Sequence, residues 1–195
     1  MAGRVNSKAY QPEAFWGFTP RPRPVYYLWF SRGDFRVKIA LIADTHDHLE
    51  RMAQALDIFD QSHAEALIHA GDMVAPLTAR QLSTFNGPIW AVFGNADGER
   101  RGLAEVLGKS IGEPPVTFEL AGRRFVLAHD KSQISDALLS QAEVAVVGHI
   151  HSPSQAHNGR ALIVNPGECC GRVTGQATVA LLDSQDLSVE IITLT

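Results

Sequence analysis

The sequence predicts an α/β fold in which two packed β-sheets are flanked by helices. Two patterns support this prediction. Between residues 37 and 97, short apolar runs alternate with amphipathic runs, which is typical of parallel strands joined by helices. After residue 115, apolar runs follow one another without long helices between them, which favours antiparallel pairing. The chain of 195 residues has an apolar content of 45%, enough for the core of one domain.

The first half of this domain is expected to contain three strands joined by two helices. The spacing is 28 residues from Asp44 to Asp72 and 23 from Asp72 to Asn95, which fits strand–helix–strand units and therefore a parallel sheet. Pro76 suits the first turn of a helix, because its missing N–H has no helical partner there. The expected strands are Val37–Ala43, Ala64–His69 and Pro88–Phe93, and the expected helices are Leu49–Phe59 and Pro76–Leu82.

The second half is expected to be richer in strands. Ala121-Gly122 separates two apolar runs and predicts a hairpin. The expected elements are the strands Val116–Leu120 and Arg123–His129, a short helix within Ser132–Gln141, and the strands Ala142–Val147, Ala161–Asn165, Thr178–Asp183 and Val189–Leu194.

Residues 1–36 differ from the rest, and we interpret them as a flexible N-terminal extension before a domain at 37–195. This segment has no clear period, and the alternating prolines of residues 20–24 favour extended backbone. A start codon assigned too early would give the same pattern, and a targeting or partner-binding arm is the alternative. The apolar run within residues 1–36 is too short and too aromatic for a secretory signal.

Composition excludes several classes of function. The net charge of −4 gives no bulk electrostatic attraction to nucleic acid. No apolar run reaches the roughly 20 residues that span a bilayer. The two cysteines, Cys169 and Cys170, are adjacent and close no loop, which fits a reducing compartment, so we expect a cytoplasmic protein. A homo-oligomeric state is compatible with the sequence.

Polar clusters follow the predicted strands, and they suggest a metal centre. The carboxyl ends of strands in an open α/β sheet converge on one crevice. Carboxylate, amide oxygen and imidazole together suit a hard divalent cation such as Mn²⁺. Each cluster alone has an ordinary explanation as a turn, a helix cap or a core histidine, but their recurrence favours a shared site. The candidate ligands are Asp44, His46, Asp72, Asn95, His129, His149 and His151.

Seven ligands exceed the needs of one ion and suit two ions that share a carboxylate. Two ions about 3.5–4 Å apart bind a phosphate and generate a bridging hydroxide for in-line attack. The sequence therefore predicts a hydrolase of phosphate esters with a dinuclear centre.

The order of these motifs resembles the calcineurin-like metallophosphoesterase superfamily, and its details resemble the small prokaryotic, archaeal-type phosphodiesterase branch. The resemblance covers roughly residues 37–195. It rests on Asp44-Thr45-His46-Asp47-His48-Leu49, His69-Ala70-Gly71-Asp72, Gly94-Asn95-Ala96-Asp97-Gly98-Glu99-Arg100, Gly148-His149-Ile150-His151 and Asn165-Pro166-Gly167-Glu168-Cys169-Cys170-Gly171.

The resemblance implies a two-sheet β-sandwich flanked by helices, the four-layer metallophosphoesterase fold. It implies one metal at Asp44, His46, Asp72 and His151, and a second at Asp72, Asn95, His129 and His149, with Asp72 bridging. Mn²⁺ is expected, although Ni²⁺, Fe or Zn²⁺ would also suit the family. Asn95 and Asp97 are the catalytic candidates, and Asn95 and Arg100 are the candidates for substrate binding.

Two positions depart from the family pattern. Ala96 stands where larger phosphatases of the superfamily place the histidine that protonates the leaving group, so esters with acidic leaving groups are the expected substrates. Asp130 follows His129 where glycine is usual, and it either orients a neighbouring ligand or faces solvent.

We expect a metal-dependent phosphodiesterase acting on a small phosphodiester. A phosphomonoesterase using the same site is the alternative. A metal-binding interaction scaffold is a weaker one, because all seven ligand positions hold competent side chains.

Overall fold

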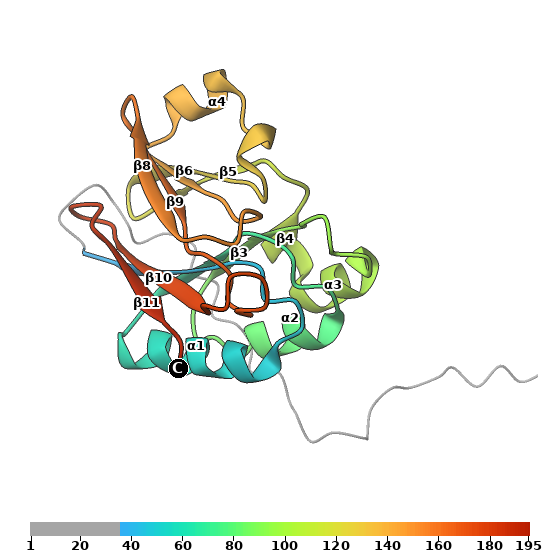
Figure 1. Ribbon diagram of the computed structural model, residues 1–195. Helices are drawn as coiled ribbons and strands as arrows, with labels where there is room; N and C mark the ends of the chain where they lie inside the picture. Colours follow the sequence, from blue (N-terminus) through green and yellow to red (C-terminus); the bar gives the residue numbers. More distant parts are fainter. Residues whose placement is uncertain (1–35) are drawn as a thin grey trace, which may run out of the picture.

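The computed structural model describes residues 36–195, which form two β-sheets with helices on their outer faces (Figure 1). The N-terminal extension expected at 1–36 lies outside the described residues except for Arg36, which forms an ion pair with Asp183. Among the described residues, no helix has the length and apolar character needed to cross a membrane.

The first sheet has six strands in the order β11-β10-β1-β2-β3-β4. Strands β1, β2, β3 and β4 run parallel, whereas β10 pairs antiparallel with both β1 and β11. This arrangement confirms the predicted strand–helix–strand units of the first half. The bounds are β1 Lys38–Ile42, β2 Ala66–His69, β3 Ile89–Val92, β4 Ile111–Gly112, β10 Thr178–Asp183 and β11 Val189–Thr193.

The second sheet has five strands in the order β5-β6-β7-β9-β8. The hairpin expected around Ala121-Gly122 forms from β5 and β6. The expectation of antiparallel pairing was wrong for β7, which runs parallel to both β6 and β9. Helix α4 connects β6 to β7, and the antiparallel strand β8 returns the chain before β9. The bounds are β5 Val116–Leu120, β6 Arg123–Leu127, β7 Val144–Val146, β8 Ser154–Asn158 and β9 Ala161–Asn165.

Helices cover the outer faces of both sheets, so the domain has four layers (Figure 1). Helices α1, α2 and α3 lie against the first sheet and α4 lies against the second. Short 3₁₀ turns occur at Gly108–Ser110 and Lys131–Gln133. The bounds are α1 Leu49–Gln61, α2 Pro76–Leu82, α3 Arg100–Leu107 and α4 Asp136–Gln141.

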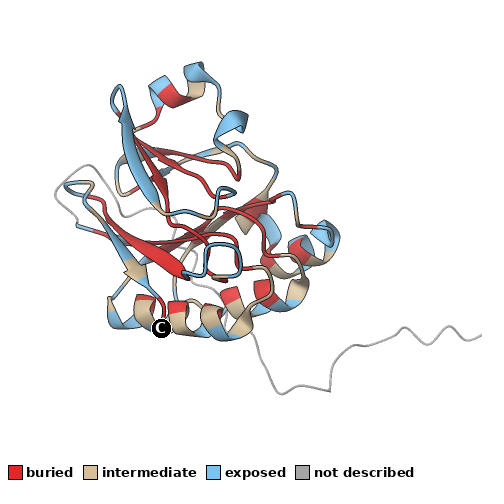
Figure 2. Cartoon of the chain, in the orientation of Figure 1, coloured by how far each residue is buried: buried red, intermediate tan, exposed pale blue. Residues whose placement is uncertain are grey.

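The alternation of side chains along β1 shows how the layers are held together. Ile39 and Leu41 enter the apolar cluster between the two sheets, whereas Ala40 and Ile42 enter the cluster under the helices. All four are fully buried, because both faces of the central strands are covered (Figure 2). The buried strands form a rigid platform, and the loops at their carboxyl ends carry the polar clusters.

Three elements were not expected from the sequence: α3, β4 and β8. Helix α3 contains Gly102, a poor helix former, but an added Cβ there would lie 2.5 Å from Pro76 Cγ, so α2 and α3 pack closely at this residue. All five residues of β8 are exposed, so this edge strand has no alternating apolar pattern to reveal it.

Candidate metal centre

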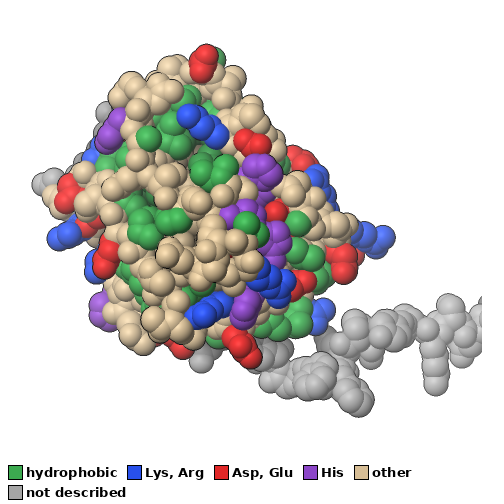
Figure 3. Space-filling model, in the orientation of Figure 1, with side chains coloured by type: hydrophobic (Ala, Val, Ile, Leu, Met, Phe, Trp, Pro, Cys, Tyr) green, Lys and Arg blue, Asp and Glu red, His purple; other side chains and the backbone are tan. Residues whose placement is uncertain are grey.

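The seven candidate ligands come from loops at the same edge of the two sheets. Asp44 and His46 follow β1, Asp72 follows β2, and Asn95 follows β3. His129 follows β6, and His149 and His151 follow β7. Since β1, β2 and β3 are parallel, as are β6 and β7, these strand ends meet, and histidine side chains gather on the face in Figure 3.

The distances show that all seven side chains lie in one cluster. His46 Nε2 and His129 Nε2 lie 3.6 and 3.5 Å from Asp72 Oδ2. His151 Nε2 lies 3.7 Å from Asp44 Oδ1, and the ring centroids of His129 and His149 are 5.1 Å apart. Asn95 Oδ1 lies 2.9 Å from His129 Nε2. Atoms bound at 2.0–2.2 Å to one ion lie about 3–3.5 Å apart, close to this spacing.

The backbone at the cluster is strained. Five of the candidate ligands have a positive φ, a backbone conformation that residues other than glycine adopt infrequently. Strain of this kind persists where the surrounding structure enforces it, and it concentrates at functional sites. The φ values are 51° at Asp44, 41° at His46, 60° at Asp72, 72° at His149 and 60° at His151.

Asp44 and His46 present buried atoms that lack a partner. Asp44 is fully buried, and its Oδ2 accepts a hydrogen bond from the His149 backbone N–H at 3.1 Å. Asp44 Oδ1 and His46 Nε2 have no hydrogen-bond partner, although both atoms are inaccessible to solvent. Burial raises the pKa of Asp44. An unpartnered buried carboxylate oxygen is unfavourable unless a cation compensates it, so this pair fits a metal ion.

Asp72 occupies the position expected of a bridging ligand. Its Oδ2 lies within 3.6 Å of histidine nitrogens from both halves of the cluster, and its Oδ1 accepts the Ala96 N–H at 2.7 Å. Burial alone would raise its pKa, but His129 and the Ala96 amide outweigh burial, so the Asp72 pKa is lowered. The carboxylate is therefore ionised and faces both groups of ligands.

His129 directs a ring nitrogen at the Asp72 carboxylate. Its Nδ1 lies 2.8 Å from the Ala70 carbonyl oxygen and must donate to it, which leaves Nε2 as an acceptor in the neutral ring. Nε2 then faces Asn95 Oδ1 and Asp72 Oδ2, two further acceptors. Three converging acceptors require a proton or a cation between them. Burial lowers the His129 pKa, but the Asp72 carboxylate outweighs it and the pKa is raised.

His149 and Asp130 interact at the exposed side of the cluster. His149 Nε2 lies 3.5 Å from Asp130 Oδ2, and 43% of the His149 side chain is exposed. The other oxygen of Asp130 accepts the Ser132 N–H at 2.8 Å and caps the short turn after β6. Asp130 therefore contacts His149, although 38% of its own side chain is exposed.

Asp97 lies beside the cluster, in a role different from the catalytic one expected. Its carboxylate accepts backbone N–H groups of Asp72 at 3.1 Å, Val74 at 2.6 Å and Gly94 at 2.7 Å. Asp97 is 3% exposed, so its oxygens are directed at the loops and not at a substrate. The carboxylate ties the loop that carries Asp72 to the loop that carries Asn95.

Arg100 was expected to bind the substrate, but in the structure it contacts Glu113 and the Gly94 carbonyl. Both oxygens of Glu113 accept from its Nη1 at 2.8 Å, and Nη2 donates to the Gly94 carbonyl at 3.3 Å. The guanidinium carbon lies 5.1 Å from the centre of the Phe93 ring. A phosphate contact would require Arg100 to leave Glu113.

Two glycines allow the ligand loops to approach each other. A Cβ at Gly94 would lie 2.1 Å from Asp72 Oδ1, and a Cβ at Gly71 would lie 2.8 Å from His129 Nδ1. Gly71 also has a φ of 97°, which a larger residue adopts only with strain. The Gly-Asp and Gly-Asn pairs of the sequence are thus explained by close packing around Asp72.

Two buried residues were quoted in the sequence motifs without a role. His69 accepts the Gly71 N–H at 3.1 Å and contacts Thr45 Oγ1 at 3.2 Å, and burial lowers its pKa to about 3. Glu168 contacts His151 Nδ1 at 2.9 Å. Burial alone would raise the Glu168 pKa, but its hydrogen bonds lower it to about 2. Only the folded contacts reveal what these two residues do beside the cluster.

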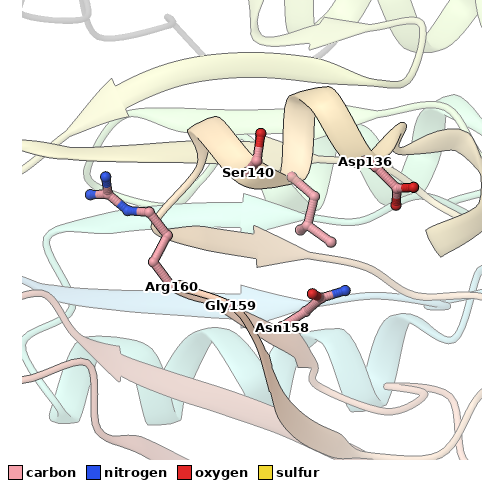
Figure 4. Close-up of a pocket in the computed structure, with 6 residues that line it drawn as sticks. Asp136, Ser140, Asn158, Gly159 and Arg160 are labelled. Atoms are coloured by element: carbon pink, nitrogen blue, oxygen red, sulfur yellow. The ribbon is translucent and has the colours of Figure 1, made fainter.

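Cys170 lies near the cluster, with its sulfur within 4.8 Å of His46 and His151. Burial raises the pKa of its thiol to about 11, and the thiol is 3.1 Å from Glu168 Oε2, to which it donates. By contrast, the seven candidate ligands offer only oxygen and nitrogen atoms. A separate surface pocket between α4 and the β8–β9 turn shares no residue with the cluster (Figure 4).

The two-sheet fold and the clustered oxygen and nitrogen side chains define an α/β sandwich with a candidate metal site between its loops. Residues 37–187 match the model of the calcineurin-like phosphoesterase superfamily domain. The chain belongs to this superfamily, which confirms the predicted fold and the expected enzyme class, a hydrolase of phosphoesters.

Relatives and solved structures agree with this assignment. Phosphodiesterase MJ0936 of Methanocaldococcus jannaschii is 35% identical over 157 residues, covering 76% of this chain and 94% of the relative. Phosphodiesterase YfcE of Escherichia coli is 29% identical over 169 residues, covering 78% and 91%. The solved structure of an archaeal phosphodiesterase aligns with a TM-score of 0.75 at 33% identity, covering 81% of this chain and all of that one.

The fold alone also occurs in proteins of another kind. Vps29 of Chaetomium thermophilum aligns with a TM-score of 0.59 at 15% identity, covering 82% of this chain and 97% of that one. A likeness at this level concerns the architecture alone.

Proposed function

We propose that this protein is a phosphodiesterase that holds two divalent cations, most favourably Mn²⁺, between the loops of its two sheets. The observation that carries the proposal is the convergence of acceptor atoms around Asp72, together with the unpartnered buried atoms Asp44 Oδ1 and His46 Nε2. Oxygen and imidazole ligands without thiolate suit such ions. The relatives named phosphodiesterase support the same reaction class.

The residues divide into two groups around the shared carboxylate. Asp44, His46, Asp72 and His151 would hold one ion, and Asp72, Asn95, His129 and His149 would hold the other. When bound, two such ions neutralise charge on a phosphate and lower the pKa of water, which supplies the nucleophile.

Asn95 is the residue best placed to bind the substrate phosphate. It is exposed, and its amide oxygen is turned toward His129 Nε2 at 2.9 Å. This orientation leaves the amide nitrogen to donate to a phosphate oxygen in front of the cluster. Asn95 would thus hold a substrate oxygen while its own oxygen faces the cations.

The next residue, Ala96, determines which esters react well. Its side chain has no proton to give, and its backbone N–H donates to Asp72. Loss of a general acid costs roughly 10²–10⁴-fold when the leaving oxygen is basic. Aryl diesters, whose leaving oxygens need no proton, are therefore expected to react faster than alkyl diesters.

The test is a hydrolysis assay of the metal-free protein with Mn²⁺ added back. Aryl diesters, alkyl diesters, aryl monoesters and anilides form the substrate panel. We expect Mn²⁺-dependent cleavage of the aryl diester, lost in Asp72→Asn and retained in Asp57→Asn, a matched change at an exposed residue of α1. Faster cleavage of monoesters would favour the phosphomonoesterase alternative, and no cleavage of any ester would favour the scaffold.

The cellular setting is part of the same proposal. Cys169 and Cys170 are both buried and free, which is compatible with a reducing compartment, and we place the enzyme in the cytoplasm.

A further inference from the structure

Glu168 is a buried acidic residue just after β9 that contacts one of the candidate ligands. It has no exposed surface. Its Oε1 accepts the N–H groups of Val173 at 2.9 Å and Thr174 at 2.5 Å, and the Thr174 hydroxyl at 2.7 Å. Its Oε2 accepts from the Val173 N–H at 3.1 Å and from the Cys170 thiol at 3.1 Å, and it lies 2.9 Å from His151 Nδ1.

These contacts require Glu168 to be an acceptor at both oxygens. Backbone N–H groups only donate, so Oε1 cannot carry a proton toward them. A carboxylate Oε2 facing His151 Nδ1 then makes that nitrogen the donor. In the neutral ring the proton on Nδ1 leaves a lone pair on Nε2, which lies 3.7 Å from Asp44 Oδ1.

We propose that Glu168 is a positioning residue that fixes the orientation and the tautomer of His151, so that Nε2 is always available to a cation. The inference rests on the proposed function, because it assigns His151 to the metal centre. The same carboxylate fastens residues 173–174 to this histidine, so the loop after β9 and the ligand loop after β7 are held as one unit. Partners of this kind behind metal-bound histidines typically contribute 10–100-fold to metal affinity.

The isosteric substitution Glu168→Gln tests the tautomer directly. A glutamine has one acceptor oxygen, which must take the Oε1 position, because the Thr174 N–H, the Thr174 hydroxyl and the shorter contact of the Val173 N–H all point there. Its NH₂ group then occupies the Oε2 position and donates to His151 Nδ1. The substitution therefore moves the ring proton to Nε2, the atom that faces the cation, with almost no change in side-chain shape.

Two control variants separate this effect from general loosening of the loop. Cys170→Ala removes another hydrogen bond to Oε2 and leaves the contact with His151. Thr174→Val removes the hydroxyl contact with Oε1 and leaves both backbone N–H groups. Neither variant changes the acceptor that faces His151.

The first measurement is ¹⁵N NMR of the histidine rings in metal-free protein at about pH 8, above the usual histidine pKa of about 6.5. We expect His151 to be protonated at Nδ1 in the wild type, Cys170→Ala and Thr174→Val, and at Nε2 in Glu168→Gln. A wild-type His151 protonated at Nε2 would overturn the proposal, and this result does not depend on whether any variant folds.

The second measurement is calorimetric titration of the same proteins with Mn²⁺. We expect Glu168→Gln to lose affinity at one site by about 10–100-fold, and the two controls to lose less than about threefold. Wild-type affinity in a folded Glu168→Gln would refute the positioning role and leave the proposed function intact. Absence of Mn²⁺ binding in the wild type would instead contradict the metal centre itself.

Discussion

Replacing Gly94 by alanine should disrupt the site through one added methyl group. A Cβ at this position would lie 2.1 Å from Asp72 Oδ1 and 2.5 Å from Asp72 N, whereas real Cβ atoms stay at least 3.0 Å from such neighbours. Asp72 has little room to move, because Oδ1 accepts from Ala96 and its N–H donates to Asp97. Relief of the clash therefore requires a shift of almost 1 Å in the carboxylate or the loop.

The expected magnitudes follow from this shift. Overpacking in a closely packed region typically costs about 1–3 kcal/mol. For a domain of this size each kcal/mol corresponds to roughly 2–4 °C in melting temperature, so we expect a decrease of about 2–12 °C. A displacement of 1 Å in a catalytic group costs on the order of 10²-fold in rate, so Mn²⁺-dependent hydrolysis should fall by about that factor.

Gly98→Ala in the same loop is the matched control. Nothing lies within 4 Å of a Cβ built on Gly98, and its φ is not positive, so this variant should keep the melting temperature and activity of the wild type. Scanning calorimetry and the aryl diester assay measure both quantities. Equal behaviour of Gly94→Ala and Gly98→Ala would refute the argument that Asp72 is held by close packing.

The other predictions concern the protonation of His129, the contacts of Arg100 and the removal of residues 1–36. The pKa of His129 is raised beside Asp72, so protons compete with the metal for this side chain. The affinity for Mn²⁺ should be full above that pKa and should fall as the pH drops through it toward 6.5 and below. A constant affinity in calorimetry from about pH 8 to 6 would contradict this. The stability of the metal-free protein should depend on pH in the opposite direction. Protonated His129 stabilises the fold below pH 6.5, and this contribution is lost as the pH rises through the raised pKa. The midpoints of urea unfolding across this pH range measure the effect. Arg100→Ala should lower the free energy of unfolding by up to about 1 kcal/mol, because its guanidinium pairs with Glu113. For the same reason it should change the KM for an aryl diester by less than about threefold. A large rise in KM at an unchanged melting temperature would indicate that Arg100 contacts the substrate. Protein beginning at Val37 should keep its melting temperature and activity, because the described core begins at that residue, and loss of either in calorimetry or the diester assay would give residues 1–36 a role.

The sequence was most informative where local chemistry determines structure. The buried strand before Asp44 and the helix opened by Pro76 have strong local signals, and both elements were confirmed. The exposed strand β8 has no such signal. Strand β7 runs parallel to β6 and to β9 because helix α4 and strand β8, respectively, return the chain between these strands. Edge strands and pairing direction are therefore determined by the tertiary arrangement.

The same distinction applies to the site. Candidate ligands could be named from residue type and position after a strand, because strand ends converge in this class of fold. The roles of Asp97 and Arg100 could not, since Asp97 binds N–H groups as far as 25 residues away and Arg100 pairs with Glu113. Glu168 was likewise visible as a motif residue, but its function depends on a contact with His151 that only the fold creates.

In the proposed centre, Asp72 joins the two cations. The most direct test of this bridge is electron paramagnetic resonance of the metal-free protein titrated with Mn²⁺, with the bound metal counted by elemental analysis. We predict two ions per chain with an exchange-coupled spectrum, and loss of the coupling in Asp72→Asn. A single bound ion, or two ions whose spectra stay uncoupled in the wild type, would contradict the claim.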